Sequence, residues 1–248
     1  IAHQHLDGLL QSRGASIASL ANSATFQATP VAQRSAYLES QRKALGLDFL
    51  YFTGTSEKWP VVQAALAGQT RTAIDIFSAE DLTAISPILA ARAQISLVPT
   101  TAALPSERLR ETRGMSVHAA APAPGGALVG GILLNRNLGF IDEMNDLVYP
   151  SGRATNGGGG TATLFLEDVR ISTNVRLFAD VRALGTRVSA VVRRRVLDQG
   201  LVWLDSAFVV NDWYVSAYEP ILDSFGARVG MLYVGFLEED YSAAKRHT

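Results

Sequence analysis

Hydrophobic residues recur at two different periods along this chain, the first helical and the later ones strand-like. In residues 1–28 apolar side chains repeat at spacings of three and four, which predicts a helix. The stripe contains Leu6, Leu10, Ile17, Leu20 and Ala24, with Arg13 filling the missing position. It suits packing along its own domain as well as a dimer seam, and the sequence leaves both interpretations open.

A second helix is predicted after Thr29-Pro30, with Thr29 as its cap and Gly46 at its end. Short apolar runs then alternate with turn residues. They predict strands at residues 47–52, 71–77, 93–98, 114–121 and 127–134, with short helices at 59–67 and after Ser78. A helix is predicted at 137–149, before a loop at 150–160 with four consecutive glycines. No strand-to-helix setting with Lys-Ser/Thr follows, so we interpret the loop as a linker.

The last third of the chain has the alternation of strands. It predicts a hairpin at 161–175, a helix at 189–197 and a three-stranded meander at 208–235, with turns at Asn211-Asp212 and Gly226. One face of the middle strand carries hydroxyl groups, from Tyr214, Ser216 and Tyr218. The other face carries Trp213, Val215 and Ala217. This arrangement suits a sheet with one ligand-binding face.

An internal repeat accompanies these strands. Residues 117–122 (VHAAAP) line up with 215–220 (VSAYEP), and residues 126–130 (GALVG) line up with 226–230 (GARVG). Each pair falls on a predicted hairpin in which Pro ends one strand and Gly lies in the turn. The repeat predicts a duplicated fold.

Four segments also carry a family resemblance: RISTNV at 170–175, GTRVS at 185–189, AFVVNDWYVSAYEPI at 207–221 and RVGMLYVG at 228–235. In this order and separation they resemble the membrane-proximal half of Cache-type double-PAS sensor domains, the extracytoplasmic input modules of bacterial histidine kinases and chemotaxis receptors. Upstream, the resemblance rests on element order, since two strands, a helical crossing and three strands follow each other as in a PAS-like sheet. It implies a periplasmic or extracellular segment between transmembrane helices of a receptor.

We therefore predict an α+β (mixed α/β) chain in which a long N-terminal helix precedes two PAS-like antiparallel sheets. The expected divisions are a helical stalk at 1–46 and a membrane-distal unit at 47–136. A connector helix and glycine-rich linker at 137–160 then lead to a membrane-proximal unit with an exit helix at 161–248.

Composition narrows the possible functions. The 248 residues carry a formal net charge of −1, with 18% charged and 48% hydrophobic residues. This balance gives no footprint for nucleic acid or for an acidic membrane surface. The absence of cysteine removes disulfides, thiol nucleophiles and thiolate metal ligands. The sequence also contains no apolar run of membrane-spanning length.

Few residues could support catalysis. His118 is the one interior histidine, because His3, His5 and His247 lie near the ends of the chain. We therefore expect no catalytic site, no metal site and no cofactor. The adjacent carboxylates Glu167 and Asp168 fall at a predicted hairpin turn, where solvated turn residues explain them better than acid–base chemistry.

Polar residues on the strands of the second unit are candidates for binding a small ligand. The alternate residues Arg170, Ser172 and Asn174 are expected to share one face. A guanidinium, a hydroxyl and an amide together could recognise a carboxylate, and Arg187 could add a second guanidinium. Arg187 is equally suited to an ion pair with Glu219 or Asp205. Four residues of the meander could either line the pocket or pack in the core: Trp213, Tyr214, Ser216 and Tyr218.

In the resembled sensors the pocket lies between the sheet and the helix-loop side, often in the membrane-distal unit. The candidates there are Tyr51, Arg71 and His118, with Trp59 as a lid. The predicted function is sensing of a small molecule, a short carboxylate such as acetate, by the input domain of a sensor histidine kinase. The alternatives are a chemotaxis receptor and a dimerisation scaffold without ligand. A homodimer through the N-terminal helix is the expected assembly.

Overall fold

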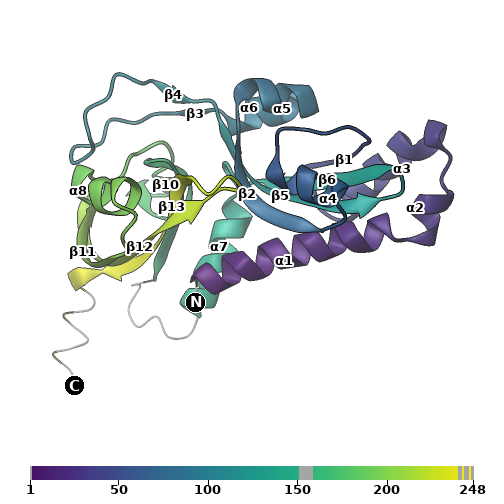
Figure 1. Ribbon diagram of the computed structural model, residues 1–248. Helices are drawn as coiled ribbons and strands as arrows, with labels where there is room; N and C mark the ends of the chain where they lie inside the picture. Colours follow the sequence, from purple (N-terminus) through teal and green to yellow (C-terminus); the bar gives the residue numbers. More distant parts are fainter. Residues whose placement is uncertain (1, 151–158, 240–241, 243–245, 247–248) are drawn as a thin grey trace.

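The computed structural model describes residues 2–150, 159–239, 242 and 246. Within these residues the chain is a mixture of helices and antiparallel sheets, with one sheet in each half and a long N-terminal helix beside both (Figure 1). The α+β class predicted from the sequence is confirmed.

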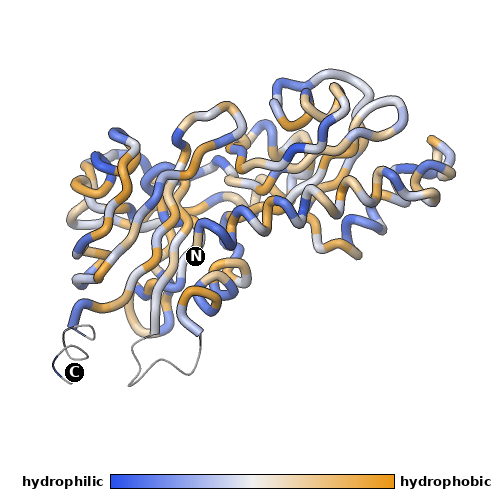
Figure 2. The backbone as a smooth tube through the Cα atoms, turned by 60° about the horizontal axis from the view of Figure 1, so that its bottom comes forward, coloured by the Kyte–Doolittle hydropathy of each residue, from blue (hydrophilic) through white to orange (hydrophobic). Residues whose placement is uncertain are grey.

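Three helices open the chain: α1 (Ala2–Ala21), α2 (Ala24–Ala28) and α3 (Val31–Ala44). The stripe of α1 is buried within the chain, with Leu6, Ile17 and Leu20 all below one-tenth exposed. Along α1 the backbone colour alternates between apolar and polar, as expected of a helix with one buried side (Figure 2). The apolar stripe therefore packs along its own domain, and it is not free to form the dimer seam.

The predicted cap of α3 is wrong. Pro30 occupies the N-cap position without a side-chain hydrogen bond, and Thr29 instead donates its hydroxyl to the carbonyl of Thr25. Gly46 follows the end of α3 with φ of +66°, as expected for a glycine that terminates a helix.

The first sheet has the order β1-β6-β5-β2. Its strands are β1 (Phe49–Thr53), β2 (Arg71–Phe77), β5 (Gly114–Ala123) and β6 (Gly126–Leu133). One face packs on α1, and the other packs on α4 (Pro60–Leu66), α5 (Ala79–Ile85) and α6 (Pro87–Ala93). The helix predicted after Ser78 is α5, and Ser78 forms a capping box with Asp81 at its start.

The strand predicted at 93–98 does not join this sheet. Only β3 (Ile95–Ser96) forms, and it pairs with β4 (Arg110–Glu111) as a separate ribbon. The segment between them crosses to the second unit, where Val98 donates its amide to the carbonyl of Gly185 at 2.9 Å. Pairing with the distant half of the chain replaces the expected sheet neighbour.

The second sheet has the order β11-β12-β13-β7-β8. Its strands are β7 (Thr161–Leu166), β8 (Val169–Thr173), β11 (Trp203–Val209), β12 (Asp212–Leu222) and β13 (Arg228–Leu237). A small ribbon, β9 (Arg176–Phe178) with β10 (Val181–Arg182), and the helical segment α8 (Ala190–Arg193) with η1 (Arg194–Asp198) complete this unit. The β11–β12 turn lies one residue earlier than predicted, because Val209 pairs with Asp212 and Val210 adopts the positive φ of 60°.

The two sheets share a strand order. If β8 is set aside, the order β7-β13-β12-β11 of the second sheet matches β1-β6-β5-β2 of the first. The repeated sequence segments fall on the corresponding hairpins, β5–β6 and β12–β13. The local repeat therefore reflects equivalent positions in two similar sheets.

One hydrophobic core extends through both units. It joins Ile17 of α1 and Val117 of the first sheet to Leu164 and Leu232 of the second. Helix α7 (Leu138–Val148) leads from the first sheet to the second and contributes Ile141 to this core. The two sheets are thus held together by shared apolar burial as well as by the chain itself.

Candidate functional site

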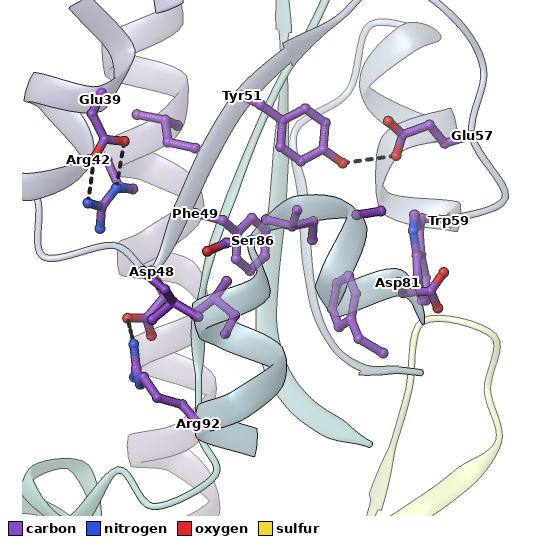
Figure 3. A pocket seen from close by; sticks show the side chains of 16 residues that line it. Glu39, Arg42, Asp48, Phe49, Tyr51, Glu57, Trp59, Asp81, Ser86 and Arg92 are labelled. Atoms are coloured by element: carbon purple, nitrogen blue, oxygen red, sulfur yellow. Dashed lines mark hydrogen bonds and ion pairs between the residues drawn. The ribbon is translucent and has the colours of Figure 1, made fainter. Parts of the chain in front are cut away.

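A cavity of about 660 Å³ lies beside β1 in the first unit, facing α3, α5 and α6 (Figure 3). Its floor is aromatic, with Phe49, Tyr51, Trp59 and Phe77. Its rim is charged, with Glu39, Arg42, Asp48, Glu57, Asp81 and Arg92. An apolar floor with a few oriented polar groups is the usual character of a small-molecule site.

The alternation of β1 determines which side chains reach the cavity. Phe49 and Tyr51 face the α4–α6 side, whereas Leu50 and Phe52 face α1. Strand β1 is an edge strand, since it pairs with β6 alone in the first sheet. The cavity therefore lies at the margin of the sheet, where helices rather than a further strand form its walls.

Both arginines of the rim are held by carboxylates. Arg42 donates Nε and Nη2 to the two carboxylate oxygens of Glu39, at 2.9 and 2.7 Å. The hydrogen bond from Arg42 lowers the pKa of Glu39. Arg92 donates Nη1 to Oδ1 of Asp48 at 2.9 Å, and Oδ2 of Asp48 accepts the amide of Leu133 at 2.7 Å. These bonds fix the positions of the guanidinium groups before any ligand arrives.

The opposite wall carries the two other carboxylates. Tyr51 donates its hydroxyl to Glu57 at 3.0 Å, and burial followed by the charge of Glu57 raises the pKa of Tyr51 well above its usual value. Asp81 accepts two hydrogen bonds from Lys58 at 2.9 Å. Four carboxylates and two arginines therefore surround the aromatic floor. Such a rim can bind a carboxylate at the arginines and a cationic group at the acids.

The structure separates the first-unit candidates. Tyr51 and Trp59 line the cavity. Trp59 is part of the buried floor and not a lid, since 7% of its surface is exposed. Arg71 lies outside the cavity and donates Nη2 to the carbonyl of Ser224 in the second unit at 3.0 Å. His118 is fully buried behind the aromatic floor, where its ring packs against Phe49, Trp59 and Phe77.

The second-unit trio does not share a face. A β-bulge interrupts the pairing of β7 with β8, so that Arg170 lies opposite Phe165 while Ser172 lies opposite Leu164. One extra residue reverses the alternation of all side chains that follow it. Ser172 consequently donates its hydroxyl to the carbonyl of Asn137 at 2.8 Å, on the side of α7.

The side chain of Asn174 forms its hydrogen bonds with main-chain groups. Its Oδ1 accepts the amide of Ala162 at 2.7 Å, and its Nδ2 donates to the carbonyl of Gly160 at 3.2 Å. These bonds continue the ladder at the start of β7 after β8 has ended. The predicted combination of guanidinium, hydroxyl and amide in one site is therefore wrong.

Arg170 is 1% exposed and lies over the ring of Phe165, 4.8 Å from the centroid. Its Nη1 donates to the hydroxyl of Thr186 at 3.1 Å and to the carbonyl of Arg187 at 3.2 Å. Burial lowers the pKa of the Arg170 guanidinium, and burial raises the pKa of the neighbouring Tyr218 to about 12. These contacts place Arg170 in the interior of the second unit, beside the apolar cluster that contains Phe165 and Tyr218.

The candidate residues of the meander lie partly in the core and partly at the surface. Tyr218 is fully buried in the core, together with Tyr233, while Tyr214 packs at its margin. Ser216 is buried and donates its hydroxyl to the carbonyl of Tyr214 at 3.1 Å. Trp213 is 53% exposed and packs on Phe208 alone among the aromatic side chains described, so it is neither core nor pocket wall.

Arg187 forms an ion pair, but with a different partner from those expected. Its Nη2 donates to Oδ2 of Asp168 at 2.6 Å, and Arg193 reaches the same oxygen at 2.8 Å. Oε2 of Glu167 accepts a hydrogen bond from Nη2 of Arg113, in the first unit, at 2.9 Å. The two carboxylates at the β7–β8 turn are therefore held by arginines. The interpretation as a solvated turn residue is wrong for Asp168, which is 1% exposed, whereas the side chain of Glu167 stays 39% exposed at the turn.

Sequence reasoning missed most of the cavity. No motif marks the rim residues: Glu39, Arg42 and Arg92 lie on predicted helices, and Asp48 lies in the strand predicted at 47–52. Asp75 was also missed, although a carboxylate between Ile74 and Ile76 in a buried strand is a signal that can be read from sequence. It is fully buried and accepts a hydrogen bond from His118, with Nδ1 and Oδ2 2.8 Å apart.

Among the described residues, no group of three or more histidines and acids is placed to hold a metal ion. His3 pairs with Asp7 and Glu219, and His5 stacks on Phe140. None of the helices in the described ranges combines the length and the apolar character that a membrane span requires.

The two antiparallel sheets and their flanking helices form the Cache/PAS-like fold expected from the sequence. Residues 132–248 match the family described as single Cache domain 3. This match confirms, for residues 132–248, the Cache resemblance noted in the sequence.

Three solved structures are similar to the chain. The periplasmic domain of Vibrio cholerae LuxQ is 13% identical, with a TM-score of 0.47 and 93% of each chain covered. The ligand-binding domain of the Pseudomonas aeruginosa amino acid chemoreceptor PctB is 13% identical, with a TM-score of 0.37, covering 95% of this chain and 89% of that one. The ligand-binding domain of the Pseudomonas fluorescens chemoreceptor CtaA is 13% identical, with a TM-score of 0.37, covering 96% of this chain and 88% of that one. No curated protein sequence matches the chain.

Proposed function

We propose that this domain senses a small organic acid in the cavity of the first unit and reports it through a transmembrane receptor. The parent is a two-component sensor histidine kinase, with a chemotaxis receptor as the alternative. The observation that carries the proposal is the pairing of an aromatic floor with a rim of two fixed arginines and four carboxylates. The proposed division into a membrane-distal unit at 47–136 and a membrane-proximal unit at 161–248 places this cavity in the distal unit.

Arg92 is the proposed receptor for the ligand carboxylate. Within the described residues only its Nη1 donates a hydrogen bond, to Asp48, so Nε and Nη2 can face a ligand. A guanidinium offers paired donors to both oxygens of a carboxylate. Glu57 and Asp81 on the opposite wall favour a short acid that also carries an ammonium group over acetate itself. The aromatic floor would contact its carbon chain.

A thermal-shift screen tests this proposal, with acetate, propionate, pyruvate, lactate, succinate, alanine and leucine as the compounds. A compound at about one hundred times its dissociation constant should add roughly 2.7 kcal/mol, or a rise on the order of 2–4 °C. Arg92→Gln should abolish the rise, because it removes the proposed carboxylate receptor.

Lys43→Gln is the matched control, since it removes a neighbouring positive charge that lies outside the cavity lining. A rise that survives Arg92→Gln would overturn the proposed site. No rise with any compound, after refolding to remove carried-over ligand, would overturn the sensing of an organic acid.

We also propose a homodimer through α1, although through a different face from the apolar stripe. Gln4, Gln11 and Ala15 are exposed on α1, outside the apolar stripe, and Gln11 and Ala15 border a groove that also contacts Thr70 and Thr72. Because the chain has no cysteine, Gln11→Cys gives a single reactive thiol. We expect oxidation to give a covalent dimer with this variant and none with exposed Ile88→Cys on α6. Equal crosslinking of both variants would contradict the proposal.

A further inference from the structure

A turn of the second unit is attached to the first sheet. The β12–β13 turn lies beside β2 in Figure 1, where Asp223 forms a parallel bridge with Ile74. Ser224 is buried at this junction, with 7% of its surface exposed. Arg71 of β2 donates to its carbonyl at 3.0 Å. The turn therefore connects the two units at a point far from their covalent link.

Asp75 of β2 is the centre of the junction. Its Oδ1 accepts the hydroxyl of Ser224 at 2.5 Å and the amide of Ser224 at 3.1 Å. Its Oδ2 lies 2.8 Å from Nδ1 of His118. A carboxylate can only accept, so Nδ1 of His118 is the donor. Ser224 bonds to Asp75 and not to His118, so the three residues are not arranged as a nucleophile triad.

His118 connects this junction to the cavity. Its ring centroid lies 5.3 Å from that of Trp59, 5.0 Å from Phe77 and 6.0 Å from Phe49, and all three of these rings line the cavity. Trp59 also lies 6.1 Å from Phe225, next to Ser224 in the turn; the pale yellow hairpin below Trp59 in Figure 3 belongs to this region. The aromatic floor of the cavity is therefore separated from the second unit by a single side chain.

On the far side of the turn, the structure is suited to move as a unit. Oδ1 of Asp223 accepts the amides of Phe225 and Ala227 at 3.0 and 2.9 Å, which stiffens the turn. Strand β13 follows and is paired on both sides, with β12 and with β7. The paired strand β13 therefore connects the turn at Ser224 to Leu237.

We propose that His118, Asp75 and Ser224 form a coupler that transmits occupancy of the cavity to the β12–β13 turn. The coupler rests on the proposed sensing function, because it assigns the route by which that site is read. A molecule that displaces the Trp59 and Phe77 rings changes the position of His118 and therefore the hydrogen bonds that hold Ser224. Residues 224–237 of the second unit are then the receiving element.

The absence of cysteine allows this coupler to be tested without knowing the ligand. Ser86 lines the cavity, and Ser86→Cys is close to isosteric. Labelling this thiol with 2-sulfonatoethyl methanethiosulfonate attaches a sulfonatoethyl group inside the cavity through a disulfide bond. Hydrogen exchange of the amides at 224–230, read by mass spectrometry on the whole chain, should change about fivefold or more on labelling. Exposed Ser35→Cys on α3, labelled in the same way, should leave these amides unchanged.

His118→Leu in the Ser86→Cys background should abolish the labelling-dependent change. His118→Asn should restore it, because its side-chain amide can place a donor where Nδ1 lies. Ser224→Ala should behave as His118→Leu does. An unchanged exchange difference in His118→Leu would overturn the coupler, and so would the lack of any effect of labelling at Ser86→Cys. Neither outcome depends on the organic-acid screen, so the two proposals can fail separately.

Discussion

Glu111 shows how a buried carboxylate in this chain is held by arginines. It is 1% exposed, and it accepts hydrogen bonds from Arg108 at 2.6 Å and from Arg113 at 2.9 Å. Arg113 also reaches Glu167 of the second unit at 2.9 Å. Burial alone would raise the pKa of Glu111, but the hydrogen bonds from the two arginines outweigh it and lower the pKa below 4.5.

We predict that Glu111 makes the domain sensitive to acid. A carboxylate with a lowered folded-state pKa contributes stability above its unfolded-state pKa, and this contribution is lost as the pH falls through the folded-state value. Glu111→Gln should cost on the order of 1–3 kcal/mol at pH 7 and flatten the loss of stability below about pH 4.5. Urea unfolding between pH 3 and pH 7 measures this, with exposed Glu107→Gln as the control. An equally steep acid dependence in Glu111→Gln would contradict the prediction.

Arg170 gives a second prediction at this scale, and it decides between the two units as ligand sites. Because Arg170 is buried among aromatic rings, Arg170→Met should fold with a stability within about 1.5 kcal/mol of the original chain. Its thermal response to the organic acids should remain, in contrast to that of Arg92→Gln. Loss of the response in Arg170→Met would move the proposed ligand site to the second unit.

At the scale of elements, the function of α1 follows from where its apolar side points. Ile17 is fully buried, and its Cδ1 comes within 2.8 Å of where a Cβ on Gly130 of β6 would lie. Glycine at this position therefore lets the helix approach the sheet closely. Helix α1 is part of the core of the first unit and continues to α7 beside the second.

Ile17→Ala should therefore destabilise the folded monomer by about 2–5 kcal/mol, the usual cost of a cavity in a core. Val31→Ala on α3 is the control, since Val31 is 79% exposed and should change stability by less than about 0.5 kcal/mol. Chemical denaturation gives both values, and analytical ultracentrifugation shows the state of assembly. A loss of dimer with unchanged monomer stability would instead support the apolar stripe as a dimer seam.

At the scale of the whole molecule, the two sheets share a core and several polar links. Leu164 of β7 lies in the same apolar cluster as Val117 of β5. The Arg113–Glu167 pair and the Asp75–Ser224 bonds add connections at two other places. A perturbation in either unit should therefore affect the other.

We predict one cooperative unfolding transition for the whole domain. Leu164→Ala, a change in the second sheet, should lower the hydrogen-exchange protection of β5 in the first sheet as well as that of β7. Calorimetry and hydrogen exchange on the intact chain measure the two effects. Two separate calorimetric peaks, or a loss of protection confined to the second unit, would show that the units are independent.

The sequence by itself determined the elements whose cause is local. Period-two and period-three-to-four patterns fix strands and helices, because a side chain's direction depends on its immediate neighbours. The β12–β13 hairpin, the helix that begins after Ser78 and the repeated hairpins were all predicted on this basis. The failures at Thr29 and at the β11–β12 turn are small shifts, in which a neighbouring residue adopted the special backbone position.

Only the tertiary structure decided which polar groups meet. The bulge in β8 separates Arg170 from Ser172, although they are two residues apart, and burial joins Asp75 to Ser224 across 149 residues. The cavity rim likewise combines residues of α3, the β1 loop and α6 that no pattern connects. The physical reason is that charge pairing and cavity shape depend on distances in space, and those distances are set by how the sheets and helices pack, which local periodicity does not encode.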